Sequence, residues 1–519
     1  MSHEWPGFAG WDAPERTIRM ADAAEPISIW NRAYLREQLE KALLNPVRAF
    51  RMAYLPLLMV YFAYGAMGIT AIAESFWVKK QLTLSAAELA SLGVWLTLPW
   101  TIKMVFGELV DTVTVMGSQR RAYVYIGAGL VAVGLVLLAA AAGPGLPGWK
   151  PESAYKLASL LITVGVVLQD VVADAMSTEV VARTNADGSA RPQADIDADL
   201  GMVQILGRLA LSVGAFIVAG LGGWLASFMP YSTVFLLALV VPVISASGAA
   251  LVHIGPVEKR PIDWRILGGG IAFGLFVVAM ALGNVAYGQE AVFLVSMVVV
   301  IAMLRRVVGD LDPATQRMIA IAAVIIFVFR AMPSVGNAYT WFSIDVLGFD
   351  ETFQGTLAQI GTGFALLGMW LFSDAITRHP VARVLLWLTI VNTVLGLPNL
   401  ALVFRVYEWT EPRFGIGAHG IALLDAAASS PFAQLSIIPM LTLIAIYAPA
   451  GRRASWFALM ASLMNLALVA GSLWTKYLNE IFVIPRGDYA LLPPLLVVVM
   501  VIGFVTPVAA ILLFGRRLH

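Results

Sequence analysis

The sequence predicts an all-α, polytopic membrane protein with six helices, a two-helix hairpin and six further helices. Three observations predict this class. The 519 residues are 59% hydrophobic and 13% charged, whereas soluble domains are about 45–50% apolar and about 25% charged. Apolar runs of the roughly 20 residues needed to cross a bilayer recur along the chain. Lys and Arg gather on alternate connecting segments, as the positive-inside rule requires.

The apolar runs give the helices in order. The first half is predicted to contain Tyr54–Val78, Ala87–Val110, Ala122–Ala142, Ala154–Val181, Leu200–Ser227 and Ser232–His253. Two shorter runs follow, Ile266–Ala286 and Ala291–Leu304. The second half is predicted to contain Met318–Leu347, Thr352–Phe372, Ala382–Phe404, Ile416–Tyr447, Ala454–Leu478 and Ala490–Phe514.

These runs divide the chain into four parts: a cytoplasmic leader at 1–51, a six-helix bundle at 52–256, a linker with the inserted hairpin at 257–312, and a second six-helix bundle at 313–519. The leader places Ile27, Trp30 and Leu35 at helical spacing among charged residues. This pattern is typical of an amphipathic helix on the inner leaflet. A solvated leader with no role in transport remains an alternative.

The topology follows from the cations. Of the 34 Lys and Arg residues, 23 fall in segments predicted inside, 8 in outer loops and 3 within helices. Both termini are therefore expected to be cytoplasmic, and the protein to lie in the inner cell membrane. A hairpin preserves this orientation whether or not both of its helices cross the bilayer.

Composition also excludes several classes of function. The net charge of +1 gives no basis for nucleic-acid binding. The chain has no cysteine, and its five histidines are scattered, so no metal site is expected. No Gly-rich loop carries Lys-Ser or Lys-Thr, which argues against ATP binding. We expect no enzyme activity and no cofactor, and the leader contains no apolar run of the kind a signal peptide needs.

Two correspondences link the halves. Asp111 precedes Arg120 by nine residues after the second helix, and Asp374 precedes Arg383 by nine after the eighth. The fifth helix begins a Leu-Ala-Leu run after Arg208, and the eleventh does so after Asn465. Such repeats are typical of transporters that bind substrate near the bilayer midplane, between two halves.

The segment Gly107-Glu-Leu-Val-Asp111 … Gly117-Ser-Gln-Arg120-Arg121 resembles the cytoplasmic loop signature of the major facilitator superfamily. The resemblance implies a gate motif, with Gly107 allowing close helix approach and Asp111 favouring the start of the next helix. Arg120 or Arg121 would pair with an acid on a neighbouring helix. A simple basic topology signal is the alternative.

A narrower resemblance is to the folate-biopterin transporter family of that superfamily. Four stretches carry it, namely Lys103-Met-Val-Phe-Gly107 … Tyr123, Gln169-Asp-Val-Val-Ala-Asp174-Ala, Pro333-Ser … Val346-Leu-Gly-Phe349 and Ile438-Pro-Met-Leu … Ser462. The chain departs from the family after Pro449-Ala-Gly451, where Arg453-Ala-Ser replaces an acidic residue followed by Gly-Thr. The resemblance implies uptake of folates or pterins coupled to an ion gradient.

Charges within membrane helices are costly and indicate function. Arg208, Arg330 and Asp170 lie about 12–18 Å deep by helical rise, and Lys103 about 10 Å deep. Arg208 and Arg330, one from each half, would bind an anionic substrate, together with Lys103. A structural Arg208–Asp170 ion pair is the alternative for Arg208. Asn337, four residues after the helix-bending Pro333, is a further polar candidate for substrate contact.

Asp170 and Asp174 share a helix face. Two carboxylates so close in low dielectric do not both ionise readily, so one is expected to hold a proton, as a coupling site requires. Both are candidates for that site; we favour coupling for Asp170 and, for Asp174 near the inner end, a gate latch with Arg120 or Arg121. Glu74 is expected in an interfacial ion pair near Lys79 and Lys80.

Several aromatic side chains, Tyr61, Tyr64, Trp77, Trp341 and Phe342, are candidates to stack on a pteridine ring. Packing against lipid or other helices is the alternative for each of them.

The sequence thus predicts a secondary transporter of folate- or pterin-like anions, proton-coupled and working by alternating access. A permease of the same fold for another solute and a non-transporting membrane assembly or pigment-handling factor are the alternatives. The expected partners are a small-molecule substrate, the bilayer and a proton or other coupling ion, with no nucleic acid. We expect a monomer.

Overall fold

The computed structural model describes residues 36, 40, 44, 48, 50–115, 117–185, 187–252, 262–283, 285–377, 379–447 and 453–515. Within these ranges the chain is helical, with no β-strand beyond two isolated bridges. Thirteen helices are long and apolar enough to cross a membrane, and one bent pair would be a fourteenth span. The predicted all-α class is confirmed. The predicted leader helix lies almost wholly outside the described residues.

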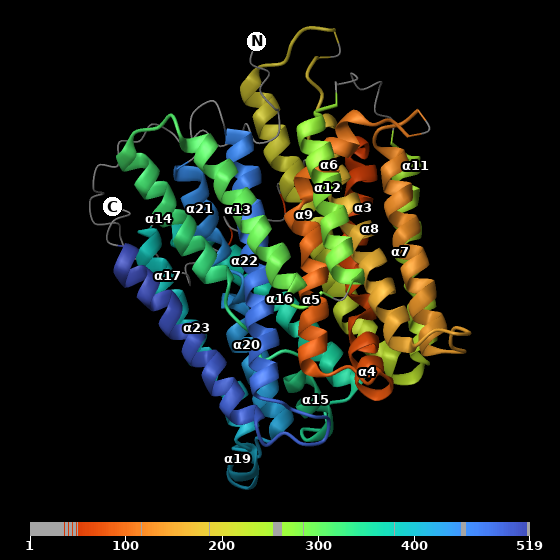
Figure 1. The fold of residues 1–519 in the computed structure, drawn as a ribbon, viewed down its shortest axis with the longest axis vertical. Helices are drawn as coiled ribbons and strands as arrows, with labels where there is room; N and C mark the ends of the chain where they lie inside the picture. Colours follow the sequence, from red (N-terminus) through yellow and green to blue (C-terminus); the bar gives the residue numbers. More distant parts are fainter. Residues whose placement is uncertain are drawn as a thin grey trace.

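The spans of the first half follow the predicted order (Figure 1). They comprise α3 (Leu55–Ala66) with α4 (Ala71–Gln81), α5 (Ala86–Thr101) with α6 (Lys103–Thr112), α7 (Arg121–Ala142), α8 (Pro151–Glu179), α9 (Gln193–Phe228), and α10 (Tyr231–Leu237) with α11 (Val240–Ala250). The hairpin consists of α12 (Trp264–Leu282) and α13 (Gly288–Val308).

The second half repeats this plan. It comprises α14 (Pro313–Arg330) with α15 (Asn337–Asp345), α16 (Glu351–Thr377), α17 (Val381–Leu395) with α18 (Leu397–Val403), α20 (Ala418–Ala433) with α21 (Ile437–Ile446), α22 (Arg453–Ile481) and α23 (Leu492–Phe514). A short helix that the sequence did not predict, α19 (Tyr407–Phe414), projects beyond the bundle between α18 and α20 (Figure 1).

Two long seams join the halves, one where α5 packs on α22 and one where α9 packs on α16. Glycines allow the second seam to close. A Cβ at Gly223 would lie 2.6 Å from Cα of Gly355 and 2.5 Å from the Glu351 carbonyl oxygen. The backbones of α9 and α16 therefore touch directly at this point.

The hairpin covers the first seam. In Figure 1 its two green helices lie across α5, α6 and α22, and α12 packs on α6 while α13 packs on α22. One hydrophobic cluster contains Val94 of α5, Val292 of α13 and Leu466 of α22, with Phe273 of α12 against it. At the hairpin turn, the Gln289 amide donates to Ser91 of α5.

Two membrane helices are broken where proline removes a backbone donor. The α5–α6 pair bends by 41° after Pro99. The seventh span breaks between Arg330 and Asn337, as Pro333 predicted. At that second break the α22 side chains replace helical hydrogen bonds: the Ser334 N–H donates to Thr475 Oγ1 at 2.9 Å, and Asn479 Nδ2 donates to the Val335 carbonyl at 3.3 Å.

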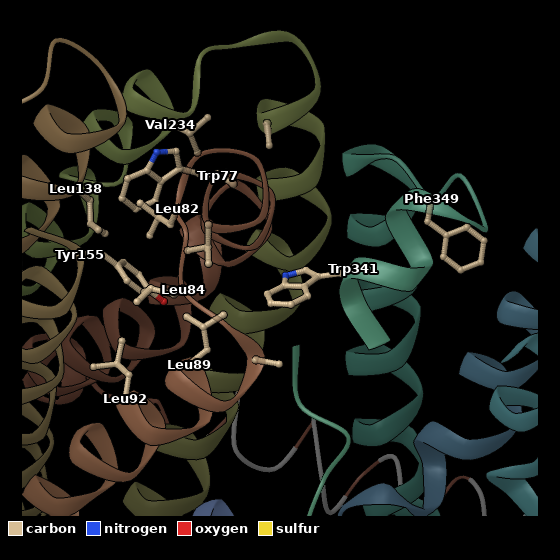
Figure 2. Close-up of a cluster of buried hydrophobic side chains, with 14 of the residues drawn as sticks. Trp77, Leu82, Leu84, Leu89, Leu92, Leu138, Tyr155, Val234, Trp341 and Phe349 are labelled. Atoms are coloured by element: carbon tan, nitrogen blue, oxygen red, sulfur yellow. The ribbon is translucent and has the colours of Figure 1, made fainter. Parts of the chain in front are cut away.

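One end of the bundle is closed by apolar packing between the halves, and we refer to this end, where α4 and α15 finish and α16 begins, as the sealed end. Figure 2 shows Trp341 of α15 projecting toward Leu84 and Leu89 of the first half. Trp341 is 2% exposed, and Trp77 of α4 in the same cluster is fully buried.

Candidate functional site

Three charged side chains of the first half meet inside the membrane, and we call Lys103, Asp170 and Asp174 the acidic cluster. Lys103 Nζ lies 2.5 Å from Asp170 Oδ2 and 2.6 Å from Asp174 Oδ2. The α5–α6 bend brings Lys103, the first residue of α6, to α8, where the two aspartates share one face. The cluster holds one cation for two carboxylates.

Aromatic side chains of α3 border the acidic cluster. Tyr61 Oη donates to Asp174 Oδ1 at 3.0 Å. The Tyr61 ring lies over Gly207 of α9, where a Cβ would come within 2.7 Å of the ring. Tyr64 stacks with Trp100, with ring centroids 6.0 Å apart. Of the predicted aromatic candidates, these two tyrosines lie beside the acidic cluster.

The two predicted substrate arginines differ in their surroundings. Arg208 of α9 is exposed, and its charge acts on Asp170 without an ion pair to any described residue. The alternative of a direct Arg208–Asp170 pair is therefore not found, because Lys103 occupies that carboxylate. Arg330 is half-buried at the end of α14, and its buried Nε has no hydrogen-bond partner. Asn337 begins α15 across the break, half-buried.

Arg120 forms a separate ion-pair group with Asp111 and Glu179. Its Nη2 lies 2.8 Å from Asp111 Oδ1 and 2.5 Å from Glu179 Oε1, and its Nη1 donates to the Val110 carbonyl at 3.2 Å. Burial alone lowers the pKa of Arg120, but the contacts with Glu179 and Asp111 outweigh burial and raise it. The group ties the ends of α6, α7 and α8 together within one half.

This geometry corrects two details of the predicted gate motif. Asp174 does not pair with Arg120, because Lys103 and Tyr61 hold it and Glu179 takes its place. Gly107 does not mark a close approach, since a Cβ there would meet nothing within 4 Å.

The remaining gate-motif residues make no described ion pair. The exposed Arg121 begins α7, where its backbone N–H donates to Ser118 Oγ. In the second half, Arg383 is exposed on α17. The side chain of Asp374 lies outside the described residues, so the repeat of the gate motif stays a prediction.

Charged side chains tie the halves together at the sealed end. Lys79 pairs with Asp345, which also accepts from Tyr489. Lys80 lies 3.0 Å from Glu351. Both ion pairs that link the halves directly within the described ranges lie at this end. Glu74, predicted near Lys79 and Lys80, instead accepts a hydrogen bond from Tyr155 at 2.9 Å.

Arg486 adds a third tie at this end. Its Nη2 donates to the carbonyl oxygens of Leu84 at 2.8 Å and Val78 at 3.3 Å, both in the first half. Its guanidinium lies 4.4 Å from the Trp341 ring centroid. Trp77, Trp341 and Phe342 are buried in this seal, which gives them a packing role in this conformation.

A polar group that the sequence left unplaced lies in the second half. Tyr339 Oη donates to Asn399 Oδ1 at 2.6 Å, and Asn399 Nδ2 donates to Asp425 Oδ2 at 3.0 Å. Asp425 Oδ1 is buried without a partner. No group of three or more His, Asp or Glu residues within the described ranges could hold a metal ion.

The residues that the sequence singled out therefore form two polar regions rather than one. The acidic cluster with its tyrosines lies in the first half, and Arg330 stands at a helix break in the second. The first region can exchange a proton, because its carboxylates outnumber its cation. The second can bind an anion, because a cation without a counter-ion is costly inside a membrane.

Known proteins are similar to this chain over most of its length. Residues 65–518 match the BT1 family. The chain is 27% identical over 469 residues to a folate-biopterin transporter of Synechocystis sp., covering 89% of this chain and 82% of that protein. It is 24% identical to a probable folate-biopterin transporter 4 of Arabidopsis thaliana, covering 85% of this chain and 91% of that one.

Among solved structures, the fold is similar to that of a POT family transporter in complex with 5-aminolevulinic acid. The TM-score is 0.63, and the match covers 90% of this chain and 96% of that one at 13% identity. At this identity the likeness shows the fold alone. The predicted major facilitator architecture is confirmed by this match and by the helix order.

Proposed function

This chain belongs to the BT1 family and is a multi-pass membrane transporter, and from that premise we propose that it carries folate- or pterin-like organic anions by alternating access, coupled to protons. The substrate class is supported by the names of its relatives, a folate-biopterin transporter and a probable one. The acidic cluster is the observation that carries the proposed proton coupling.

Charge balance in the cluster supports a proton site. Among the described residues, Lys103 is the one cation in ion-pair contact with the two carboxylates, Tyr61 donates a neutral hydroxyl to Asp174, and Arg208 acts on Asp170 without an ion pair. An excess negative charge within a membrane helix is costly, and one proton removes it. The Asp170 side chain is 11% exposed and that of Asp174 is 50% exposed. Asp174 therefore offers the path by which a proton reaches Asp170.

Arg330 is the proposed contact for the substrate anion. Arg presents a planar fork of donors that matches a carboxylate in two parallel hydrogen bonds. Here the Nε donor is buried and unused. Arg208, exposed and close to the acidic cluster, would supply the second cation from the other half, and Asn337 would add an amide across the helix break.

The sealed end supports an alternating-access cycle. Its ion pairs and aromatic packing close one face of the bundle, and we propose that this face is the outer one. Both termini would then be cytoplasmic, in a monomer of the inner cell membrane. Binding of anion and proton would reduce the charge inside the membrane and permit the halves to rock about the bound substrate.

Transport in proteoliposomes tests the proposal. Purified protein should accumulate radiolabelled folate or biopterin when the bath is more acidic than the lumen. Asp170→Asn should abolish accumulation driven by the proton gradient while substrate exchange persists, because the neutral amide mimics the protonated acid. Asp187→Asn, in an exposed loop, is the matched control. Absence of uptake of any pterin or folate, or gradient-driven accumulation by Asp170→Asn, would contradict the proposal.

The anion site has its own test. Arg330→Gln should raise KM for folate, which has carboxylates, by at least about tenfold, since hydrogen bonds to charged groups contribute about 1.5–3 kcal/mol. KM for the uncharged biopterin should change by less than about twofold. Arg121→Gln, at an exposed position outside the bundle interior, should change neither value.

A further inference from the structure

The bend between α5 and α6 determines where Lys103 lies. Pro99 cannot donate a backbone hydrogen bond, and α5 ends two residues later at Thr101. The chain then turns by 41°, and Lys103 begins α6 with its ammonium between the two aspartates of α8. The position of the cation therefore depends on the backbone at this bend.

A side chain from the other half holds that backbone. Asn465 of α22 donates from Nδ2 to the carbonyl oxygen of Trp100 at 2.9 Å. Trp100 precedes Lys103 by three residues and lies in the last turn of α5, next to the break at Ile102. The helix turn around Asn465 is firmly packed, since Leu466 and Ala467 are fully buried. Asn465 also occupies the place in α22 that Arg208 occupies in α9, by the repeat of Leu-Ala-Leu.

We propose that Asn465 is a positioning residue for the acidic cluster, which links the charge state of that cluster to the position of the second half. Its hydrogen bond to Trp100 maintains the bend that brings the Lys103 ammonium to Asp170 and Asp174. When the halves rock and this bond is lost, the bend relaxes, Lys103 withdraws, and the two carboxylates compete for a proton. This inference rests on the proposed proton coupling.

Other charged and titratable groups also face the cluster. They are Tyr61 and Tyr64 from α3 and Arg208 from α9. All three belong to the first half, as the cluster itself does. Asn465 differs from them because its hydrogen bond crosses to the half that moves.

The same helix offers a matched control. Asn479 of α22, 4% exposed, donates to the Val335 carbonyl at the break of the seventh span. Both partners belong to the second half, so this bond does not join the halves. Asn479→Leu and Asn465→Leu each remove a side-chain amide from α22. In both cases the amide donates to a carbonyl near a break in a membrane helix. Of the two, Asn465 is the one that bonds to the end of α5 preceding Lys103.

Two measurements test the inference. The first is the pH profile of substrate uptake in proteoliposomes, with substrate exchange as proof that each variant is folded and binds. Asn465→Leu should flatten the profile and reduce gradient-driven accumulation at least several-fold, with KM for exchange within twofold of the parent. Asn465→Gln, which keeps the donor, should restore part of the profile. Asn479→Leu should leave the profile unchanged.

The second measurement does not depend on proton coupling. Because the chain has no cysteine, Lys103→Cys with Asp170→Cys provides one defined pair for a short bifunctional maleimide. Adding Asn465→Leu should slow cross-linking several-fold, and adding Asn479→Leu should not.

The outcomes separate the two ideas. If uptake by the parent protein does not depend on pH, proton coupling fails, and the cross-linking rate alone decides the positioning role. An unchanged pH profile and an unchanged cross-linking rate in Asn465→Leu would overturn the inference. Equal effects of Asn479→Leu would also overturn it, because the role would then be structural only.

Discussion

Arg486 joins the two halves at the sealed end by two hydrogen bonds. Its removal should therefore open that end. Its Nη2 donates to Leu84 at 2.8 Å, while the bond to Val78 is longer, at 3.3 Å. The guanidinium also lies 4.4 Å from the Trp341 ring centroid. Arg486 is half-buried, and this burial lowers its pKa. The two hydrogen bonds join the halves only while the end is sealed, whereas the ring contact lies within the second half.

The size of the effect follows from these contacts. A hydrogen bond from a charged donor contributes about 1.5–3 kcal/mol, and a cation–π contact about 0.5–2 kcal/mol. Only the hydrogen bonds cross between the halves, so counting the shorter one, Arg486→Ala should cost the sealed conformation about 1.5–3 kcal/mol. Each 1.4 kcal/mol is a tenfold change in an equilibrium constant. The ratio of open to sealed molecules should therefore rise by roughly 10- to 140-fold.

Labelling of a single cysteine measures this ratio. Ala338→Cys places a thiol at a fully buried position of α15 within the seal. A water-soluble maleimide reaches it only when the end opens, so the labelling rate follows the open population. Arg413→Ala is the matched control, because Arg413 stacks on Trp409 of its own helix, with the ring centroid 4.7 Å away. Equal labelling rates for Arg486→Ala and Arg413→Ala would refute the reasoning.

Two further predictions concern stability. Arg120→Gln should lower the midpoint of thermal unfolding, followed by tryptophan fluorescence, because it leaves two carboxylates without their cation at a cost of about 3–5 kcal/mol. Arg121→Gln, which is exposed, should shift the midpoint little, and equal shifts would contradict the ion-pair group. Gly65→Ala should sharply reduce the yield of monodisperse protein, since its Cβ would lie 1.9 Å from the Leu211 carbonyl oxygen. Gly93→Ala has open space and should fold normally, so a matching loss there would argue against close α3–α9 packing.

The spans could be predicted because apolar length is a local property of the chain. The break at Pro333 could also be predicted from local sequence, because proline removes a backbone hydrogen-bond donor from the helix that contains it. The comparable break after Pro99 carried the same signal, and a search for proline inside predicted spans would have found it.

Partners between helices could not be predicted in this way. Glu179 pairs with Arg120 across 59 residues, and the choice between Glu179 and Asp174 depends on how far α8 extends and how it is rotated. Asp174 instead pairs with Lys103, which reaches it because the chain bends between α5 and α6. Such contacts arise from tertiary packing, so the sequence predicted which residues carry charge but not which of them meet.

The hairpin gives the two seams between the halves different neighbours in the bilayer. Along α5 and α22 the hairpin helices stand between the seam and the lipid, with Leu275 of α12 and Val298 of α13 each 66% exposed on their outer surface. Along α9 and α16 the closure depends on Gly223 and Gly355, where backbone meets backbone. If the halves rock as proposed, acyl chains would contact the second seam directly and the first only through the hairpin. Bilayer thickness and chain order would then act on the two seams unequally.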